Sequence, residues 1–444
     1  MSGIQCRLAR YAAAGMLAGT AVAAESTAQP TALGNTGNEI QQPVGQAMQA
    51  IYVRFAQATG GDPDQLTDPG QRDLFLRCSE MVETAEFLDQ GDWVPQGERI
   101  EEITSFAELD AALQQVGIEE LSAEGTNAAE TSRLRVPLSR LAALRRAAAA
   151  GPHGAGDLLA SARWALFFDG TLSFGSRDAT SREDRFDYNV PALALGVDYR
   201  FEGNAILGGA VGYETFDAAF DNNESTAAGG DFESDLFSLS AYSSYRLARF
   251  FVDGAVTFGW NDYRLTRRVV YPRVVRAAES ATQGHEYDVL ATLGYSGHLD
   301  RLQYEPFVQV MNRGRAVDGY TETAASGLNL VVMDQEIDSL LLILGSQFCW
   351  QFRSGSGIVV PRFEVEWFHE FQNASRLITA RFESDPFGTL FSVPTDEPDA
   401  DYFHLAAGVS RVWGTTQGFV NLGTALGLDD VTSYIVTGGV RFAL

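Results

Sequence analysis

The five histidines of this chain are the residues best able to act as catalytic bases or metal ligands, but their spacing favours neither role. They are His153, His285, His298, His369 and His404. No two are four residues apart, the spacing that places two ligands on one face of a helix. His369 and His404 flank the polar stretch 373–401, where aspartates could approach them. Such a pair could activate a hydrolytic nucleophile, but solvated histidines in polar loops are far more frequent.

Other catalytic motifs are absent from the sequence. It has no Gly-x-Ser-x-Gly turn, no Gly-Asp-Ser-Leu block and no phosphate-binding loop. Residues 25–124 contain no histidine, which argues against a Ser-His or Cys-His enzyme in that region. Cys78 recurs with Leu74, Met81 and Ala85 at helical spacing, which indicates a buried thiol rather than a nucleophile. We predict no catalytic, cofactor or metal site and no enzymatic activity.

A second group with chemical potential is a run of arginines between residues 126 and 150. They are Arg133, Arg135, Arg140, Arg145 and Arg146. Alanine and leucine dominate the rest of this stretch and no acid follows Glu130, so the sequence predicts a basic helix. At about 1.5 Å per residue, 25 helical residues reach roughly 37 Å, which is enough to cross a membrane barrel. A linker helix on the protein surface is the alternative.

Composition and the first 24 residues limit the compartment and the partners. The net charge of -26 argues against nucleic-acid binding, which needs clustered Lys and Arg. Arg7 and Arg10 precede an apolar stretch that ends in small residues before Glu25, the layout of a secretory signal peptide cleaved after Ala24. After residue 24 the chain offers no run of about 18 apolar residues for a membrane helix.

From residue 164 to the end, apolar and polar residues alternate, as they do in strands with one apolar and one polar face. In 251–263, for example, Val256, Phe258 and Trp260 alternate with Thr257 and Asn261. Twelve strands are predicted, and they begin near Trp164, Tyr188, Asn204, Asp235, Arg249, His285, Leu302, Glu336, Ile358, Tyr402, Gln417 and Thr432.

The connections between these strands alternate between short and long. The predicted long connections are 217–231, 266–284, 317–334 and 373–401. A transmembrane β-barrel has short periplasmic turns and longer external loops, whereas a soluble sandwich, the competing fold, has no reason to sort its loops. The sequence therefore predicts a mainly β protein with a 12-stranded antiparallel transmembrane barrel and a small α-helical N-terminal domain.

The alternation also assigns a face to each strand residue. Predicted lipid-facing residues include Leu166, Phe168, Leu172, Phe237, Leu239, Tyr245, Val308, Val310, Phe363, Val365, Trp367, Leu405 and Val409. The predicted inward acids include Glu286, Asp288, Glu305, Glu364 and Glu366. We hypothesise that these acids bind the arginines of the basic helix, which would then plug the lumen and leave the barrel non-conducting. The alternative is that the charges only line a water-filled channel.

Residues 39–121 have a helical rather than an alternating pattern. Three or four short amphipathic helices are predicted there. Ser105 and Glu108 have the spacing of a capping box, which marks the start of one helix. At about 80 residues this bundle would be only marginally stable by itself.

The C-terminal two thirds resemble the autotransporter family of Gram-negative bacteria. The resemblance rests on 140–145 (Arg-Leu-Ala-Ala-Leu-Arg), 166–170 (Leu-Phe-Phe-Asp-Gly), 195–200 (Leu-Gly-Val-Asp-Tyr-Arg), 305–307 (Glu-Pro-Phe), 366–371 (Glu-Trp-Phe-His-Glu-Phe) and 438–442 (Gly-Gly-Val-Arg-Phe). It implies four parts: a signal peptide (1–24), a short helical passenger-like region (25–124), a basic linker helix in the lumen (125–155) and the barrel (156–444).

The family resemblance also implies an assembly signal in the last strand. Tyr434, Val436, Val440, Phe442 and Leu444 share one face, and the barrel-assembly machinery of the family reads such a strand, usually through a terminal aromatic residue. This chain departs from that pattern because it ends in an aliphatic residue, with its last aromatic residue at Phe442. The expected partners are outer-membrane lipid, that machinery and periplasmic chaperones, with no nucleic acid and no cofactor.

The function we predict is a monomeric outer-membrane barrel that anchors the helical segment and translocates it to the cell surface, without enzymatic activity. Two alternatives remain open at this point. The barrel could be a porin-like channel whose N-terminal region stays in the periplasm. It could also be a surface hydrolase that uses the outer loops.

Overall fold

A computed structural model describes residues 33, 37–90, 98–117, 162–202, 204–223, 227–354 and 357–444 of the chain. Three α-helices come first, α1 (Gln41–Thr59), α2 (Pro69–Gln90) and α3 (Phe106–Val116), with a short 3-10 helix η2 (Pro63–Gln65) between the first two. The predicted N-cap at α3 is present, since Ser105 Oγ accepts a hydrogen bond from Glu108 N at 3.4 Å. None of the described helices combines the length and the apolarity needed to span a membrane.

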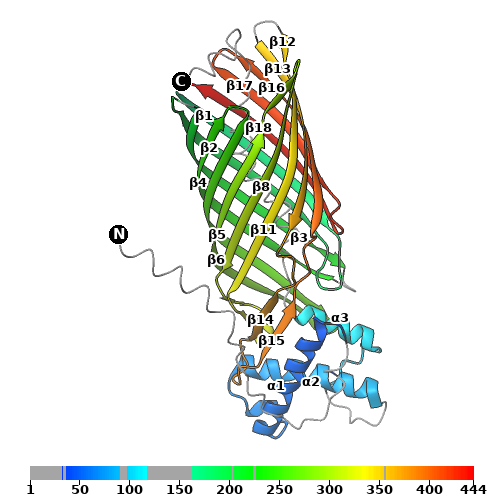
Figure 1. Ribbon diagram of the computed structural model, residues 1–444. Coiled ribbons are helices and arrows are strands. Elements are labelled where there is room, and N and C mark those ends of the chain that lie inside the picture. The colour runs from blue at the N-terminus through cyan, green and yellow to red at the C-terminus, as the bar shows by residue number, and fades with distance from the viewer. Residues whose placement is uncertain are drawn as a thin grey trace, which may run out of the picture. The chain divides into compact units, whose positions relative to one another are not determined.

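Twelve long antiparallel strands form a closed barrel (Figure 1). They are β1 (Trp164–Arg177), β2 (Phe186–Arg200), β3 (Ala205–Asn223), β4 (Ala227–Leu247), β5 (Phe250–Tyr271), β6 (Val274–Tyr295), β8 (Leu302–Val317), β11 (Gln335–Trp350), β13 (Gly357–Glu370), β16 (Asp401–Trp413), β17 (Thr416–Leu426) and β18 (Val431–Ala443). The first and last strands pair with each other, with Leu166 opposite Phe442, and so close the barrel. Short strands β7 (Gly297–Leu299) and β12 (Phe352–Ser354) extend two of the turns.

The predicted alternation places apolar side chains outside and polar ones inside. On β5, Val252, Phe258 and Trp260 are each more than half exposed, whereas Asp253 and Asn261 are buried. The predicted lipid-facing residues follow the same rule and are exposed or partly exposed. So large an exposed apolar surface would be unstable in water and is expected where the solvent is lipid. The closed sheet with an apolar outer surface excludes a soluble sandwich.

Two of the predicted long connections are wrong, because the strands continue through them. Strands β3 and β4 pair as far as Asn223 opposite Ala227, within the predicted loop 217–231. Strands β5 and β6 pair as far as Tyr271 opposite Val274, so that only Pro272 and Arg273 form the turn inside 266–284. Beyond Trp260 the outward residues become polar, starting with Asp262 and Arg264, while Tyr263 and Leu265 face inward, so the apolar face changes sides and the pattern of a lipid-facing strand ends.

The two remaining long connections contain a separate small sheet with strand order β15-β14-β10-β9. Residues 318–334 contribute β9 (Tyr320–Thr321), the 3-10 helix η3 (Ser326–Leu328) and β10 (Leu330–Val332). Residues 371–400 contribute β14 (Leu377–Phe382) and β15 (Leu390–Pro394). We call these two segments, together with the ends of β5 and β6 (267–278), the loop platform.

The three helices pack against the loop platform. We call the described residues between 37 and 117 the helical cap. One hydrophobic core contains residues from both parts. From the cap, it includes Val44, Met48, Ile51, Phe55, Leu74, Phe75, Cys78, Met81, Leu109 and Leu113. From the platform, it includes Val269, Tyr271, Val274, Ala325, Leu328, Leu330, Ile378, Phe382, Phe391 and Val393. Helices and barrel therefore belong to one compact unit.

Candidate functional site: barrel lumen and cap interface

The five acids predicted to face the lumen do face inward. Three of them, Glu286, Asp288 and Glu305, are buried on β6 and β8, and Glu366 is buried on β13. Two acids pair with arginines of the barrel wall itself: Arg313 Nε lies 2.7 Å from Asp288 Oδ1. The neighbouring Arg315 Nε lies 3.3 Å from Glu286 Oε2. The wall thus supplies part of the positive charge that its own acids require.

The other three acids have polar partners, on the same strand for Glu305 and on adjacent strands for Glu364 and Glu366. Glu305 Oε1 accepts a hydrogen bond from Gln303 Nε2 at 2.8 Å, and Glu364 Oε2 accepts one from Gln347 Nε2 at 2.9 Å. Glu366 Oε2 lies 3.3 Å from Nδ1 of the inward-facing His404. Glu305, Glu364 and Glu366 also line an internal cavity, together with Asp253 and Arg362. This cavity carries a net excess of carboxylates and suits a cationic occupant.

The five arginines predicted to bind these acids lie outside the described residues. Their pairing with the lumen wall therefore stays a prediction. The signal peptide 1–24 also lies outside the described residues.

The two histidines singled out in the sequence lie on opposite faces of the barrel wall. His369 is on the outward face, where its Nδ1 is 3.0 Å from Asp401 Oδ1 and its ring stacks on Trp367. His404 faces inward and is buried. The two cannot form one catalytic site. Within the described residues, no cluster of three or more His, Cys, Asp or Glu side chains is arranged to hold a metal ion.

The predicted terminal residues lie on the outer face of β18 and, for Leu444, directly after it. Tyr434, Phe442 and Leu444 are exposed to the lipid side, while Val436 and Val440 are half-buried among neighbouring strands. Their arrangement on one face agrees with the predicted pattern.

Arg267 on β5 connects the barrel to the third helix of the cap. Its Nη2 and Nε donate to the two carboxylate oxygens of Glu322 at 2.6 and 2.8 Å. Its Nη1 donates to the carbonyl oxygens of Gln115 and Val116, at 3.2 and 3.4 Å. Those carbonyls lie at the C-terminal end of α3, where backbone acceptors lack helical partners and a cation is favoured. Arg267 and Glu322 are both buried.

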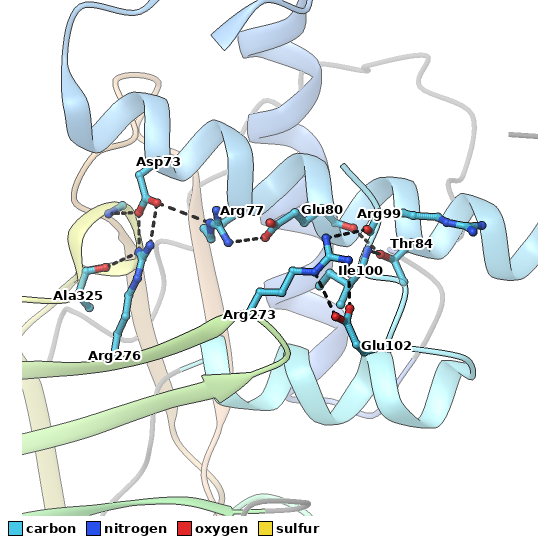
Figure 2. A network of polar contacts seen from close by, with 11 residues as sticks. Asp73, Arg77, Glu80, Thr84, Arg99, Ile100, Glu102, Arg273, Arg276 and Ala325 are labelled. Carbon is cyan, nitrogen blue, oxygen red and sulfur yellow. Dashed lines mark hydrogen bonds and ion pairs between the residues drawn. The ribbon is translucent and has the colours of Figure 1, made fainter. Parts of the chain in front are cut away.

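A second arginine of the platform, Arg276 on β6, binds the second helix (Figure 2). Both of its terminal nitrogens bind the Asp73 carboxylate, one of them at 2.8 Å, and Gly327 N donates to the same carboxylate at 2.9 Å. Burial favours neutral Asp73, but the hydrogen bonds from Arg276 and Gly327 outweigh it and lower the pKa of Asp73 below its ordinary value. Asp73 is therefore ionised and bound in a bidentate pair.

Next to this pair, Glu80 lies buried on α2 (Figure 2). Burial raises the pKa of Glu80 to about 7, although Arg77 at 2.7 Å and Arg273 of the β5–β6 turn oppose the shift. Arg273 itself binds Glu102 of the cap at 3.1 Å.

Apolar contacts complete the interface between cap and platform. The rings of Phe55 on α1 and Phe387 in the platform meet edge to face, with centroids 5.3 Å apart. Gly327 of η3 lies against the backbone of α2: a Cβ atom there would be 2.3 Å from Leu74 N. All three helices therefore contact the platform directly.

The comparisons with known proteins agree with this architecture. Residues 166–423 match the family model described as "Autotransporter beta-domain". The chain belongs to the autotransporter family. It therefore has the outer-membrane barrel of type V secretion in a Gram-negative bacterium, and this barrel domain is itself non-enzymatic.

Individual relatives share the barrel at low sequence identity. The translocator domain of autotransporter NalP from Neisseria meningitidis has the same fold, with a TM-score of 0.51 and 14% identity, covering 72% of this chain and 98% of that one. Esterase EstA of Pseudomonas aeruginosa is 28% identical over 263 residues, which are 56% of this chain and 38% of the esterase. An uncharacterized protein of Pseudomonas putida is 30% identical over 169 residues, 36% of this chain and 27% of that protein. The chain thus matches well under half the length of these curated relatives.

Sequence reasoning missed the cap interface. Arg267, Arg273 and Arg276 read as charges of a solvated loop, because the segment around them had been assigned to a connection. A signal was available: Val269, Tyr271 and Val274 are too apolar for an exposed loop of that length.

Proposed function

We propose that the barrel translocates the helical cap to the cell surface and holds it there without catalysing a reaction. The observation that carries this proposal is the position of the loop platform. The barrel strands start and end at the short-turn end, with Leu444 N bonded to Trp164 O, whereas the platform lies at the end with the long connections. Short turns face the periplasm in outer-membrane barrels, which supports an external position for the cap.

The ends of the cap and the first strand support passage through the lumen. Helix α3 ends at Val116, beside Arg267 at the platform end, while Trp164 begins β1 at the short-turn end. The residues between them must connect the two ends of the barrel. Five arginines in this stretch would be costly in lipid but would find carboxylate partners in the lumen. This route agrees with the plug hypothesis.

Each alternative function has less support. A channel with a periplasmic N-terminal region would require the cap to leave the platform and expose the shared core to water. The similarity to esterase EstA covers 38% of that protein, and the described residues of the cap contain no histidine. The outer histidine pair of a hydrolase is not formed, because His404 faces the lumen.

We also propose that the last strand serves as the assembly signal. The exposed Tyr434 and Phe442 on β18 and Leu444 directly after it would be recognised by the barrel-assembly machinery after delivery by periplasmic chaperones. One chain supplies all twelve strands, so the barrel needs no second copy to close.

Two epitope insertions test the location of the cap. One is placed between Gly60 and Gly61, an exposed turn of the cap with open space around both residues. The matched insertion follows Gly414, which is equally open and lies in a short turn. On intact cells, antibody should bind the first epitope only, and permeabilised cells should bind both. A cap epitope that is silent until permeabilisation would refute surface display.

A further inference from the structure

The helical cap does not enclose a core of its own. Its helices share one hydrophobic core with the loop platform, and fully buried residues of both parts lie within it, including Leu74 and Met48 of the cap and Leu328 and Phe382 of the platform. The contact of Gly327 with α2 is close enough to exclude even a methyl group. The platform therefore completes the interior of the cap rather than touching its surface.

Polar groups of the cap are also completed by the platform. Asp73 is ionised in a partly buried site through Arg276 and Gly327, and the carbonyl end of α3 is satisfied by Arg267. Without the platform these groups would lose their partners, at the cost of unsatisfied or unpaired polar atoms. A bundle of about 80 residues has little stability to spare for such losses.

We propose that the loop platform is the folding template of the helical cap. The proposal deepens the proposed function. The cap helices would acquire their packed core only in contact with the platform, because the buried side chains of both parts form that one core.

The same contacts make the cap a resident of the barrel rather than a released product. Arg267 binds the carbonyls of Gln115 and Val116, Arg273 binds Glu102 and Arg276 binds Asp73, and all three contacts join platform to cap without involving the chain connection. Cutting the chain between cap and barrel would leave each of them in place. The cap should therefore stay bound after such a cut.

Cys78 provides the measurement, because it is fully buried in the shared core. In the full-length chain, Cys6 and Cys349 are replaced by Ala so that Cys78 is the one remaining thiol. The purified protein in detergent is treated with a maleimide, and the labelling rate reports how often the cap opens. Heat-modifiable migration on a gel verifies in the same sample that the barrel is folded.

The variant Gly327→Val changes the platform without altering the cap or the barrel wall. The overpacked contact with Leu74 should raise the labelling rate of Cys78 by about 10- to 100-fold. Gly327→Ala should give an intermediate rate. The matched control is Leu377→Ala, since Leu377 lies in the same small sheet with 67% of its surface exposed, and its labelling rate should equal that of the parent. Arg276→Gln provides a second, polar disruption with the same expected direction.

The template proposal is overturned if Cys78 stays as protected in Gly327→Val and Arg276→Gln as in the parent chain while the barrel is folded. Such a result would mean that the cap closes its own core. Because this measurement uses purified protein, it does not depend on which side of the membrane the cap occupies. The epitope experiment on intact cells tests that location separately.

Discussion

Replacing Arg267 by Met should loosen the cap more than any other single change at the interface. The substitution leaves Glu322, with a side chain only 5% exposed, as a buried carboxylate without its cation. It also removes the donor to the carbonyls of Gln115 and Val116. Removing one partner of a buried ion pair typically costs about 3–5 kcal/mol. The free energy of cap opening should fall by about that amount, which is a rise in the opening equilibrium of roughly 150- to 5,000-fold.

The assay is maleimide labelling of Cys78 at increasing urea concentrations in the full chain without other thiols. A second change, Glu322→Gln, should restore part of the stability lost in Arg267→Met, because the amide carries no charge. In the parent chain Leu330 N donates to the Glu322 carboxylate at 2.8 Å, and the glutamine oxygen can still accept that hydrogen bond. Arg264→Met is the control, since Arg264 pairs with Glu233 and Asp235 on the exposed outer face and should leave the labelling unchanged. If Arg267→Met labels like the parent, or if the double variant is no better than the single one, the proposed role of the buried pair is wrong.

Three further predictions address pH, assembly and conduction. Because the pKa of Glu80 is raised to about 7 in the folded cap, the cap should lose up to about 3 kcal/mol of stability as the pH rises from about 4.5 to 7. The free energy of cap opening from the Cys78 assay should fall with pH in the parent and not in Glu80→Gln. Phe442→Ala should reduce the fraction of heat-modifiable barrel in membranes more than Leu422→Ala, a control at another exposed apolar residue on the adjacent strand. Equal assembly of the two would contradict a terminal signal. Deletion of residues 126–150 should raise the single-channel conductance, and an unchanged conductance would refute the lumen plug.

The membrane-spanning part of the barrel could be predicted from sequence because lipid imposes a simple rule on it. Alternation from Val252 to Trp260 follows from one face in lipid and one in a polar lumen, and it gave the strand, its faces and its neighbours. Beyond Trp260 the outward residues of β5 are polar and the inward ones largely apolar, so the rule for a lipid-facing strand no longer applies. The strands continue there because their backbones remain paired, which no local pattern reports.

The cap interface could not be predicted because it joins residues that are far apart in the chain. The helical pattern correctly placed Cys78 in a core, yet nothing local to α2 indicates that Gly327 and Arg276 complete that core. The aspartate at position 73 reads as an ordinary surface residue of an amphipathic helix. Its environment depends on the β5–β6 hairpin, because its partner Arg276 lies 203 residues later in the chain.

The two-residue turn of Pro272 and Arg273 constrains how this protein can vary. External loops of membrane barrels normally tolerate insertions, since they extend into solvent. Here the residues on both sides of the turn, Arg267 and Arg276, must point to the same side of the hairpin to reach the cap. One added residue in either strand would turn one of these arginines to the opposite face. Among homologues that retain the cap, this turn should therefore keep its length even where its residues differ, so that an alignment gap at this place would mark the loss of the cap.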